Sequence, residues 1–425
     1  MNWPLPQDFN EAVQNPPTAF ADPDLKGGQP VVGAQGLPLP RSGNFADVYQ
    51  MRGPGGRDWA VKCFTRPVFG LDDRYAKVGE ALNRVNLPFG IGFTFLSEGI
   101  RVRGEWRPAV KMEWVEGLLL NQVVRENAGR PMVLSALVQM WVKLCRRLRE
   151  VGIAHADLQH GNVILVPGSR SGTFGLKLID YDGMYVPALA NRPSGEAGHP
   201  NYQHPTRVAG RVYSPDLDRF PHLVIVTALK ALECCGPALW DRYDTGDNLL
   251  FVEDDFRTPA SSRLMRSLWD SGHPAVQALV GQLAIACGKP IPQTPWLDQI
   301  APDGVLSPLD DETARAAAAA LGAPVQVAVP AEVPAAPEPA AAANVFAGLD
   351  LDDEPAPAPI RSQKAAEKPT ARKPVRKAEL AAEGKKFPVL PVAIAGGVLL
   401  LVGMIAGAVL IFGGKKPDDT TQSGG

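Results

Sequence analysis

One stretch decides the fold, VGIAHADLQHGNVIL at residues 151–165. Its apolar ends favour the last turn of a helix and the start of a buried strand. Between them lies a short polar loop that carries His155, Asp157 and, five residues later, Asn162. Polar side chains on a loop between two buried elements are typical of a functional site.

Two carboxylates and one amide follow one another at fixed intervals in this region. Asp157 and Asn162 are followed, eighteen residues after Asn162, by Asp180 in the sequence LIDYDG. Phosphoryl transfer from ATP needs one carboxylate to orient the acceptor hydroxyl and oxygen ligands to hold magnesium. Asp157 suits the first task, and Asn162 and Asp180 suit the second. His155 is better explained as a packing residue than as a base.

The spacing HxDLxxxN, followed by DYxG, resembles the catalytic loop and the metal-binding loop of the protein-kinase family. The resemblance covers about residues 35–300. It implies an α+β, two-lobed protein-kinase fold, with a small β-rich N-lobe and a large, mostly helical C-lobe. It also implies ATP and Mg²⁺ as cofactors, with Asp157 as the residue that orients the acceptor.

A lysine that suits the nucleotide lies upstream in the apolar strand DWAVKCF, residues 58–64. Lys62 stands at its centre, and a lysine in a buried strand needs negative charge beside it. The kinase resemblance makes Lys62 a catalytic residue that meets the α- and β-phosphates of ATP. It also implies that Glu80, in the expected helix 73–85, pairs with Lys62.

The rest of the expected ATP site consists of a glycine loop and a hinge. Gly43 lies nineteen residues before Lys62, where a missing side chain lets backbone N–H groups approach phosphates. Arg41 and Ala46 stand where kinases have further glycines. The segment around Glu113 and Val115 resembles the strand-to-hinge connection, whose backbone would hold the adenine edge. Without the kinase context, both segments suit an ordinary hairpin and an ordinary strand.

Three further departures from the family pattern bear on function. Ala156 replaces the arginine that reads a phosphorylated activation loop, and Gln159 replaces a phosphate-contacting lysine. Asp182 stands at the place of the family's glycine. Two interpretations of Asp182 stay open: it adds a carboxylate near the metal ions, or it points away from them.

Features beyond the metal-binding loop favour the large lobe of protein kinases over that of aminoglycoside phosphotransferases. Residues 198–205, GHPNYQHP, resemble the end of an activation segment. Asp218 precedes a long apolar helix expected at 221–235. It matches the family's buried aspartate that bonds the catalytic-loop backbone, and it also suits a helix N-cap.

Composition bounds the setting of the domain. The net charge of −2 over 425 residues gives no field that favours nucleic acid. Five cysteines are scattered through apolar runs without metal-ligand spacing, which is typical of a reducing compartment. The first residues lack the basic and apolar regions of a signal peptide.

The C-terminal third changes character. An alanine-rich helix is expected at 310–321, followed by an acidic Ala/Pro-rich segment and a basic run with nine Lys/Arg against three Glu. Neither segment has an apolar face, so both are expected to be disordered. The expected organisation is an N-terminal extension packing on the kinase domain (1–34), N-lobe and hinge (35–117), C-lobe (118–300), helical extension (301–322), linker (323–387), transmembrane helix (388–412) and polar tail (413–425).

Residues 388–412 form an uncharged run of about 25 residues, long enough as a helix to span a ~30 Å hydrocarbon core. The basic run before it keeps the preceding domain in the cytoplasm by the positive-inside rule. We therefore expect a single-pass protein of the cell (inner) membrane, with lipid contacts through the helix and the basic segment. Gly403 and Gly407, four apart, permit a homodimer through close helix packing.

The sequence favours one function and leaves two others open. The favoured one is a membrane-anchored cytoplasmic kinase that transfers the γ-phosphate of ATP to protein Ser/Thr hydroxyls. The alternatives are a nucleotide-binding pseudokinase acting as a regulatory scaffold, or a small-molecule kinase of the same superfold. The protein substrate and the activating signal are not encoded in any pattern that we identify.

Overall fold

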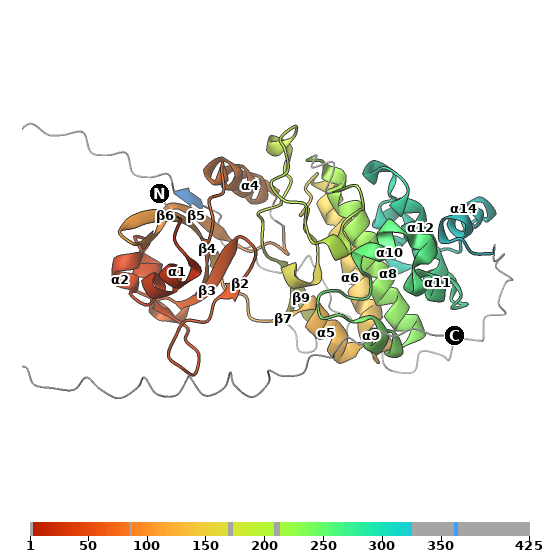
Figure 1. The fold of residues 1–425 in the computed structure, drawn as a ribbon, viewed down its shortest axis with the longest axis horizontal. Coiled ribbons are helices and arrows are strands. Elements are labelled where there is room, and N and C mark those ends of the chain that lie inside the picture. The colour runs from red at the N-terminus through yellow and green to blue at the C-terminus, as the bar shows by residue number, and fades with distance from the viewer. Residues whose placement is uncertain (1–2, 86, 169–172, 208–212, 325–360, 364–425) are drawn as a thin grey trace, which may run out of the picture. The chain divides into compact units, whose positions relative to one another are not determined.

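The computed structural model describes residues 3–85, 87–168, 173–207, 213–324 and 361–363 of the chain. All of them belong to one compact unit, which extends over residues 1–367. The described part begins with a sheet-rich region and continues with a helical region (Figure 1). The expectation of an α+β chain with its sheet first and its helices second is therefore confirmed.

One twisted sheet forms the centre of the N-terminal region. Its strand order is β1-β3-β4-β6-β5-β10, and β2 pairs with β3. Every pairing is antiparallel except that of β10 with β5. The strands are β1 (Gln29–Pro30), β2 (Arg41–Ser42), β3 (Ala46–Arg52), β4 (Asp58–Phe64), β5 (Phe93–Val102), β6 (Glu105–Glu113) and β10 (Arg361–Gln363). The short β10 lies within 323–387, for which we expected no secondary structure.

The alternation of side chains along β4 determines where Lys62 points. Successive residues of a strand face opposite sides of the sheet. Ala60 and Phe64 belong to the main core, which includes the buried face of α4 (Leu71–Val85). Val61 and Cys63 belong to a second core on the other side of the sheet. Lys62 shares the alternation of Ala60 and Phe64, so it faces the main core.

Three short N-terminal helices cover the outer side of the sheet. They are α1 (Pro6–Val13), α2 (Pro16–Ala19) and α3 (Pro23–Lys26). Phe9 and Phe20 are buried in the second core. Lys111 of β6 also faces this side, and its Nζ lies 2.7 Å from Asp22 and 2.9 Å from Asp24. These carboxylates satisfy a lysine that burial would otherwise destabilise.

The helical region is built around α6 and α8, which pack on each other and on the following helices. Its helices are α5 (Leu120–Asn127), α6 (Pro131–Glu150), α8 (Arg219–Cys235), α9 (Ala238–Tyr243), α10 (Glu253–Arg257), α11 (Arg263–Trp269), α12 (Pro274–Cys287), α13 (Leu297–Ile300) and α14 (Asp311–Leu321). The long apolar helix expected before Cys235 and the alanine-rich helix expected before Leu321 are both present.

A small sheet lies at the start of the helical region. It joins β7 (Leu118–Leu119), β8 (Val163–Pro167) and β9 (Phe174–Leu178). Gly117 passes so close to β8 that an added Cβ would lie 2.3 Å from the carbonyl oxygen of Leu165. Only glycine permits this approach, and it fixes the connection after β6 beside the strand that follows the 155–162 loop.

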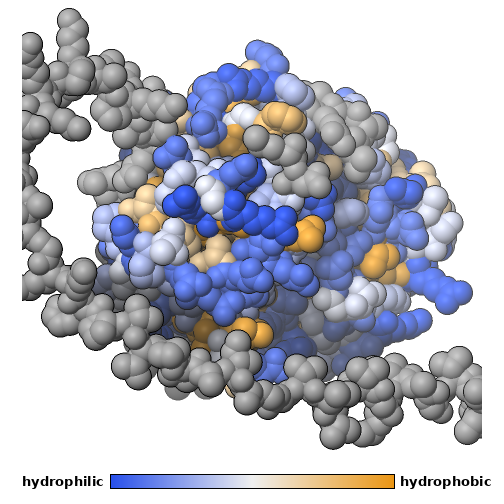
Figure 2. Space-filling model, turned by 60° about the vertical axis from the view of Figure 1, so that its left-hand side comes forward, coloured by the Kyte–Doolittle hydropathy of each residue, from blue (hydrophilic) through white to orange (hydrophobic). Residues whose placement is uncertain are grey.

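The surface reflects how the large apolar side chains are used. In the view of Figure 2 the described residues are mostly hydrophilic, and apolar ones lie in small separate patches. The most exposed large apolar side chain in the described part is Phe69, at 95%. No described helix is long and apolar enough to cross a membrane. Residues 388–412, including Gly403 and Gly407, lie outside the described residues.

Two phenylalanines provide a matched test of the second core. Phe9 is fully buried, whereas Phe69 is 95% exposed. We expect Phe9→Ala to lower the free energy of unfolding by about 3–5 kcal/mol, because it leaves a cavity under the sheet. Phe69→Ala should change it by less than about 0.5 kcal/mol. Denaturant titration of both variants checks this, and equal effects would contradict the packing described for α1.

Candidate functional site

The loop predicted to be catalytic lies between α6 and β8, and its polar groups bond one another. The Nδ2 of Asn162 donates to the carboxylate Oδ2 and to the backbone carbonyl of Asp157, both at 2.9 Å. The other oxygen of Asp157, Oδ1, accepts the backbone N–H of His199 at 2.7 Å. Asp157 and Asn162 are thus brought together, as their spacing predicted. Burial raises the pKa of the Asp157 carboxyl, although the His199 amide opposes this.

The side chain of Asp218 binds the backbone of the same loop. Its carboxylate accepts the backbone N–H groups of His155, at 2.5 Å, and of Ala156, at 2.8 Å. Ala156 has φ +66°, a left-handed conformation that costs energy for a residue with a side chain. The predicted bond from Asp218 to the loop backbone is confirmed, while its side chain makes no helix-cap bond. Burial raises the pKa of the Asp218 carboxyl to about 6.

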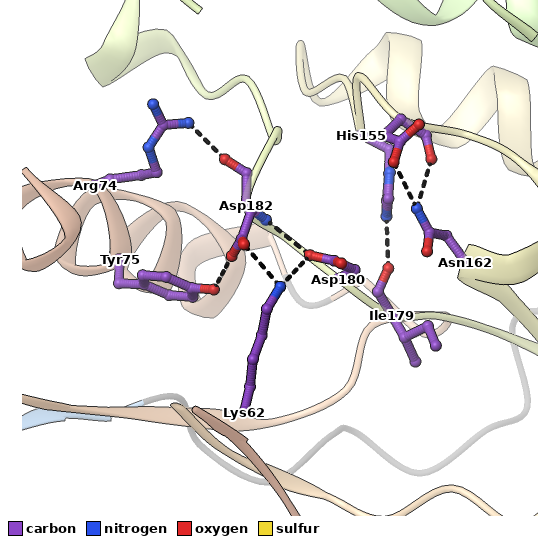
Figure 3. Close-up of polar contacts among 9 residues, drawn as sticks. Lys62, Arg74, Tyr75, His155, Asn162, Ile179, Asp180 and Asp182 are labelled. Atoms are coloured by element: carbon purple, nitrogen blue, oxygen red, sulfur yellow. Dashed lines mark hydrogen bonds and ion pairs between the residues drawn. The ribbon is translucent and has the colours of Figure 1, made fainter. Parts of the chain in front are cut away.

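His155 also has a structural role. Its ring Nε2 lies 2.9 Å from the backbone carbonyl of Ile179, one residue before Asp180 (Figure 3). The ring is fully buried. His155 therefore links the 155–162 loop to the segment that carries Asp180, in agreement with its interpretation as a packing residue.

Lys62 reaches from the sheet to the loop after β9. Its Nζ lies 2.7 Å from Asp180 Oδ1 and 2.7 Å from Asp182 Oδ2 (Figure 3). Burial alone would lower the pKa of the Lys62 ammonium, but these two carboxylates raise it well above its ordinary value. Partial burial opposes ionisation of Asp180, yet the charge of Lys62 lowers the pKa of that carboxyl. The negative charge that the sequence demanded for Lys62 is therefore present.

Asp182 is in turn bound to α4. Its Oδ1 accepts the hydroxyl of Tyr75, and its backbone carbonyl accepts Nη1 of Arg74 at 2.5 Å. Figure 3 shows Arg74 and Tyr75 approaching Asp182 from the same helix. Burial, followed by the charges of Asp182 and Asp180, raises the pKa of the Tyr75 phenol well above its ordinary value. Tyr75 consequently stays protonated and acts as a donor. Asp182 therefore points toward Lys62 and lies beside Asp180.

The predicted pairing of Lys62 with Glu80 is wrong. Glu80 instead lies 2.8 Å from Arg84 on the same helix, and its side chain is 70% exposed. At 3.6 residues per turn, Glu80 lies about 140° around the helix from Tyr75. Because Tyr75 faces the core, Glu80 faces away from Lys62. The number of residues between Lys62 and Glu80 suits the kinase pattern, but Glu80 lies on the exposed face of α4.

The segments expected as the nucleotide loop and the hinge both adjoin strands of the sheet. Gly43 forms the turn between β2 and β3, where its N–H donates to the Ala46 carbonyl at 2.8 Å. An added Cβ there would meet only that carbonyl oxygen, at 3.5 Å. The protein's own packing therefore does not require a glycine. Glu113 ends β6, and its carboxylate lies 3.1 Å from Arg57; Val115 follows, half-buried.

Sequence reasoning missed one acidic residue that faces this site. Glu196 is held by its backbone carbonyl, which accepts Nη2 of the buried Arg207 at 3.1 Å. Burial, then the negative charges of Asp182 and Asp180, raises the pKa of the Glu196 carboxyl to about 8. No motif contains Glu196, because only the path of the folded chain brings it here.

The residues that could hold a divalent ion are few. Among the described residues, no group of three or more His, Cys, Asp and Glu side chains is arranged to hold a metal ion. A site at this place would need Asn162, Asp180 and oxygens from a ligand. The bonds of the Asn162 Nδ2 turn its amide oxygen away from Asp157 (Figure 3). An amide oxygen and a carboxylate are donors that suit a hard cation.

Glu196 makes the stability of the fold depend on pH. An acid whose pKa is raised by folding contributes a destabilisation that grows as pH rises from its unfolded pKa, about 4.5, to its folded pKa, about 8. We expect Glu196→Gln to remove this part of the decline. The melting temperature of the variant minus that of the wild type should increase by at least about 2 °C from pH 5 to pH 9.

The control for this measurement is Glu312→Gln, at an exposed position of α14. Thermal unfolding of the three proteins at several pH values should give parallel curves for Glu312→Gln and the wild type. A Glu196→Gln curve that is also parallel to the wild type would contradict the environment described for Glu196.

Comparison with known proteins gives one distant similarity. No family model matches the chain. A search of curated proteins finds the inhibitor of nuclear factor kappa-B kinase epsilon subunit homolog 1 of Caenorhabditis elegans, 28% identical over 178 residues. The match covers 38% of this chain and 21% of that protein, so the chain spans about a fifth of its relative's length. The chain thus has a kinase-like relationship to part of a protein kinase.

Proposed function

We propose that this chain is a protein kinase that uses ATP and magnesium and transfers the γ-phosphate to Ser/Thr hydroxyls. One observation carries the proposal. A lysine from the sheet lies 2.7 Å from Asp180, the carboxylate that follows β9, while Asp157 and Asn162 bond each other in the 155–162 loop. Elements more than a hundred residues apart in the chain thus assemble the groups that phosphoryl transfer requires. The similarity to part of a protein kinase supports the same conclusion.

Each residue of the assembly has a separate task in this proposal. Asp157 orients the acceptor hydroxyl and takes its proton, aided by the raised pKa of its carboxyl. Asn162 and Asp180 would hold magnesium, which supplies charge neutralisation at the phosphates. Lys62 binds phosphate oxygens through its buried Nζ, which Asp180 and Asp182 contact in this structure.

The adenine and phosphate ends would be held mainly by backbone groups. The absence of a side chain at Gly43 leaves open space at the β2–β3 turn, and no neighbouring group fills that space. The backbone carbonyl of Glu113 and the backbone N–H of Val115 would bind the adenine edge. Arg41, in β2, stacks its guanidinium 4.7 Å from the centroid of the Trp114 ring, which closes the loop onto the hinge. A narrow nucleotide entrance is the expected consequence.

A pseudokinase is the second candidate, because both carboxylate oxygens of Asp157 already have partners. Oδ1 accepts the N–H of His199, and Oδ2 accepts Nδ2 of Asn162. A substrate hydroxyl reaches Asp157 only if His199 gives way or if the hydroxyl shares Oδ2. A chain in which neither happens binds nucleotide as a regulatory scaffold without transferring phosphate.

Membrane anchoring belongs to the same proposal and depends on the sequence. The uncharged run 388–412 and the basic residues before it support a single-pass helix with the kinase domain on the cytoplasmic side. The long linker then permits the domain to reach substrates along the membrane surface.

Phosphotransfer can be tested with the full chain, labelled ATP and magnesium. We expect Asp157→Asn to reduce transfer by about 10²- to 10⁴-fold while nucleotide binding persists, and Lys62→Met to reduce transfer as much and to weaken nucleotide binding as well. Asp303→Asn serves as the matched control, because Asp303 is exposed at 84% and far from Asp157 in the chain. Transfer that is equal in all four proteins would overturn the assigned roles. Nucleotide binding without transfer by the wild type would favour the pseudokinase.

The anchor can be tested by fractionation of cells that express the full chain. We expect the protein to stay with membranes in high salt and at alkaline pH, which remove proteins bound by charge alone. Deletion of 388–412 should release it, because this segment lies in the longest uncharged run of the chain. Release of the undeleted chain by high salt would show that the basic run, and not a spanning helix, holds it.

A further inference from the structure

Helix α4 presents no carboxylate to the site. Its three acidic residues, Asp72, Asp73 and Glu80, are all exposed. Its buried face consists of Leu71, Tyr75, Val78, Gly79 and Leu82. Turning Glu80 toward Lys62 would need a rotation of about 140°, which would carry these apolar side chains out of the core. The helix therefore cannot supply the counter-ion of Lys62 by any small movement.

The counter-ion comes instead from the loop after β9. We infer that Asp182 is the positioning residue for Lys62, and that Tyr75 and Arg74 of α4 hold Asp182 in place. The inference rests on the proposed function. Its basis is that one carboxylate bridges Lys62, at 2.7 Å from Oδ2, and the Tyr75 hydroxyl, at Oδ1. The backbone of Asp182 is bound as well, through Arg74 Nη1 at 2.5 Å.

A second carboxylate is necessary because Asp180 has two tasks. Asp180 bonds Lys62 in this structure, yet in the proposed reaction it must turn an oxygen to magnesium. Lys62 is only 5% exposed, so if Asp180 were its only carboxylate, the turn of Asp180 to magnesium would leave a buried charge without a carboxylate partner. Asp182 removes that conflict, because it stays with Lys62 while Asp180 serves the metal.

The rest of the loop is fixed in a way that suits this division of tasks. The hydroxyl of Tyr181, between the two aspartates, accepts the backbone N–H of Ile91 at 2.7 Å and donates to the Leu178 carbonyl at 2.9 Å. Arg74 also bonds the hydroxyl of Tyr213, a buried residue beside Ala156. The position of α4 is thereby coupled to Lys62 through Asp182, and none of the acidic residues of the helix takes part.

Four variants of the full chain test the inference. Asp182→Asn keeps the shape and removes the charge, Tyr75→Phe removes one hydroxyl, and Glu80→Gln alters an acid that the structure places outside the site. We expect Asp182→Asn to raise the KM for ATP and lower kcat, reducing kcat/KM by about 10- to 100-fold, and Tyr75→Phe to do the same more weakly. Glu80→Gln should match the wild type. Asp182→Glu should restore part of the loss.

Two outcomes would overturn the inference. One is that Glu80→Gln lowers kcat/KM as much as Asp182→Asn does, which would restore the helix as the source of the counter-ion. The other is that Asp182→Asn raises the magnesium concentration needed for half-maximal rate while leaving the KM for ATP unchanged. That result would make Asp182 a metal ligand.

A readout without catalysis separates this inference from the proposed function. Backbone hydrogen exchange of residues 71–85 should become faster in Asp182→Asn and in Tyr75→Phe, but not in Glu80→Gln, because only the first two loosen the bond between α4 and the loop. Binding of ATP with magnesium, measured by titration, should weaken in the same order. If the wild type binds ATP but transfers no phosphate, these two measurements still decide the role of Asp182. Unchanged exchange and binding in Asp182→Asn would refute it.

Discussion

The burial of one ammonium group constrains the whole site. Lys62 is placed on the inner side of the sheet by the alternation of β4, and a charge there must be compensated. Asp180 and Asp182 supply the compensation from a loop of the helical region. This pair of contacts ties together the two regions of the chain. Any displacement of the sheet relative to that loop separates unlike charges in a poorly hydrated place, so the contact fixes the site and the arrangement around it.

A second constraint shapes the loop that carries Asp157. Ala156 and Asp180 both adopt positive φ, at +66° and +65°, which a residue with a side chain adopts only when its surroundings enforce it. For Ala156 the enforcement comes from Asp218, which accepts its N–H and that of His155. Burial of the Asp218 carboxylate raises its pKa and so carries a cost in stability. That cost is explained if the strained loop is needed for the position of Asp157.

The local sequence pattern predicted the features that depend on a single strand or a single loop. The alternation around Lys62 predicted a buried lysine in a strand, and the spacing of Asp157 and Asn162 placed them in one loop. The predicted pairing of Glu80 with Lys62 was wrong because spacing along the chain does not show which face of a helix is buried. In α4 that face is set by the burial of Tyr75, Val78 and Leu82. The sequence left the direction of the Asp182 side chain open, because its partners come from a helix that is distant in the chain. Glu196 carried no signal at all.

The segment that follows Asp182 adds contacts to the site that none of the sequence motifs contains. Arg207 is almost fully buried, and its Nη2 bonds both Ser194 Oγ and the Glu196 carbonyl at 3.1 Å. In the kinase resemblance, the basic residue near this loop belongs to the position that Ala156 occupies. Here the cation is Arg207, which lies close enough to Asp218 and Asp157 for their charges to oppose the lowering of its pKa by burial. Arg207 therefore anchors the same segment in which His199 donates its N–H to Asp157.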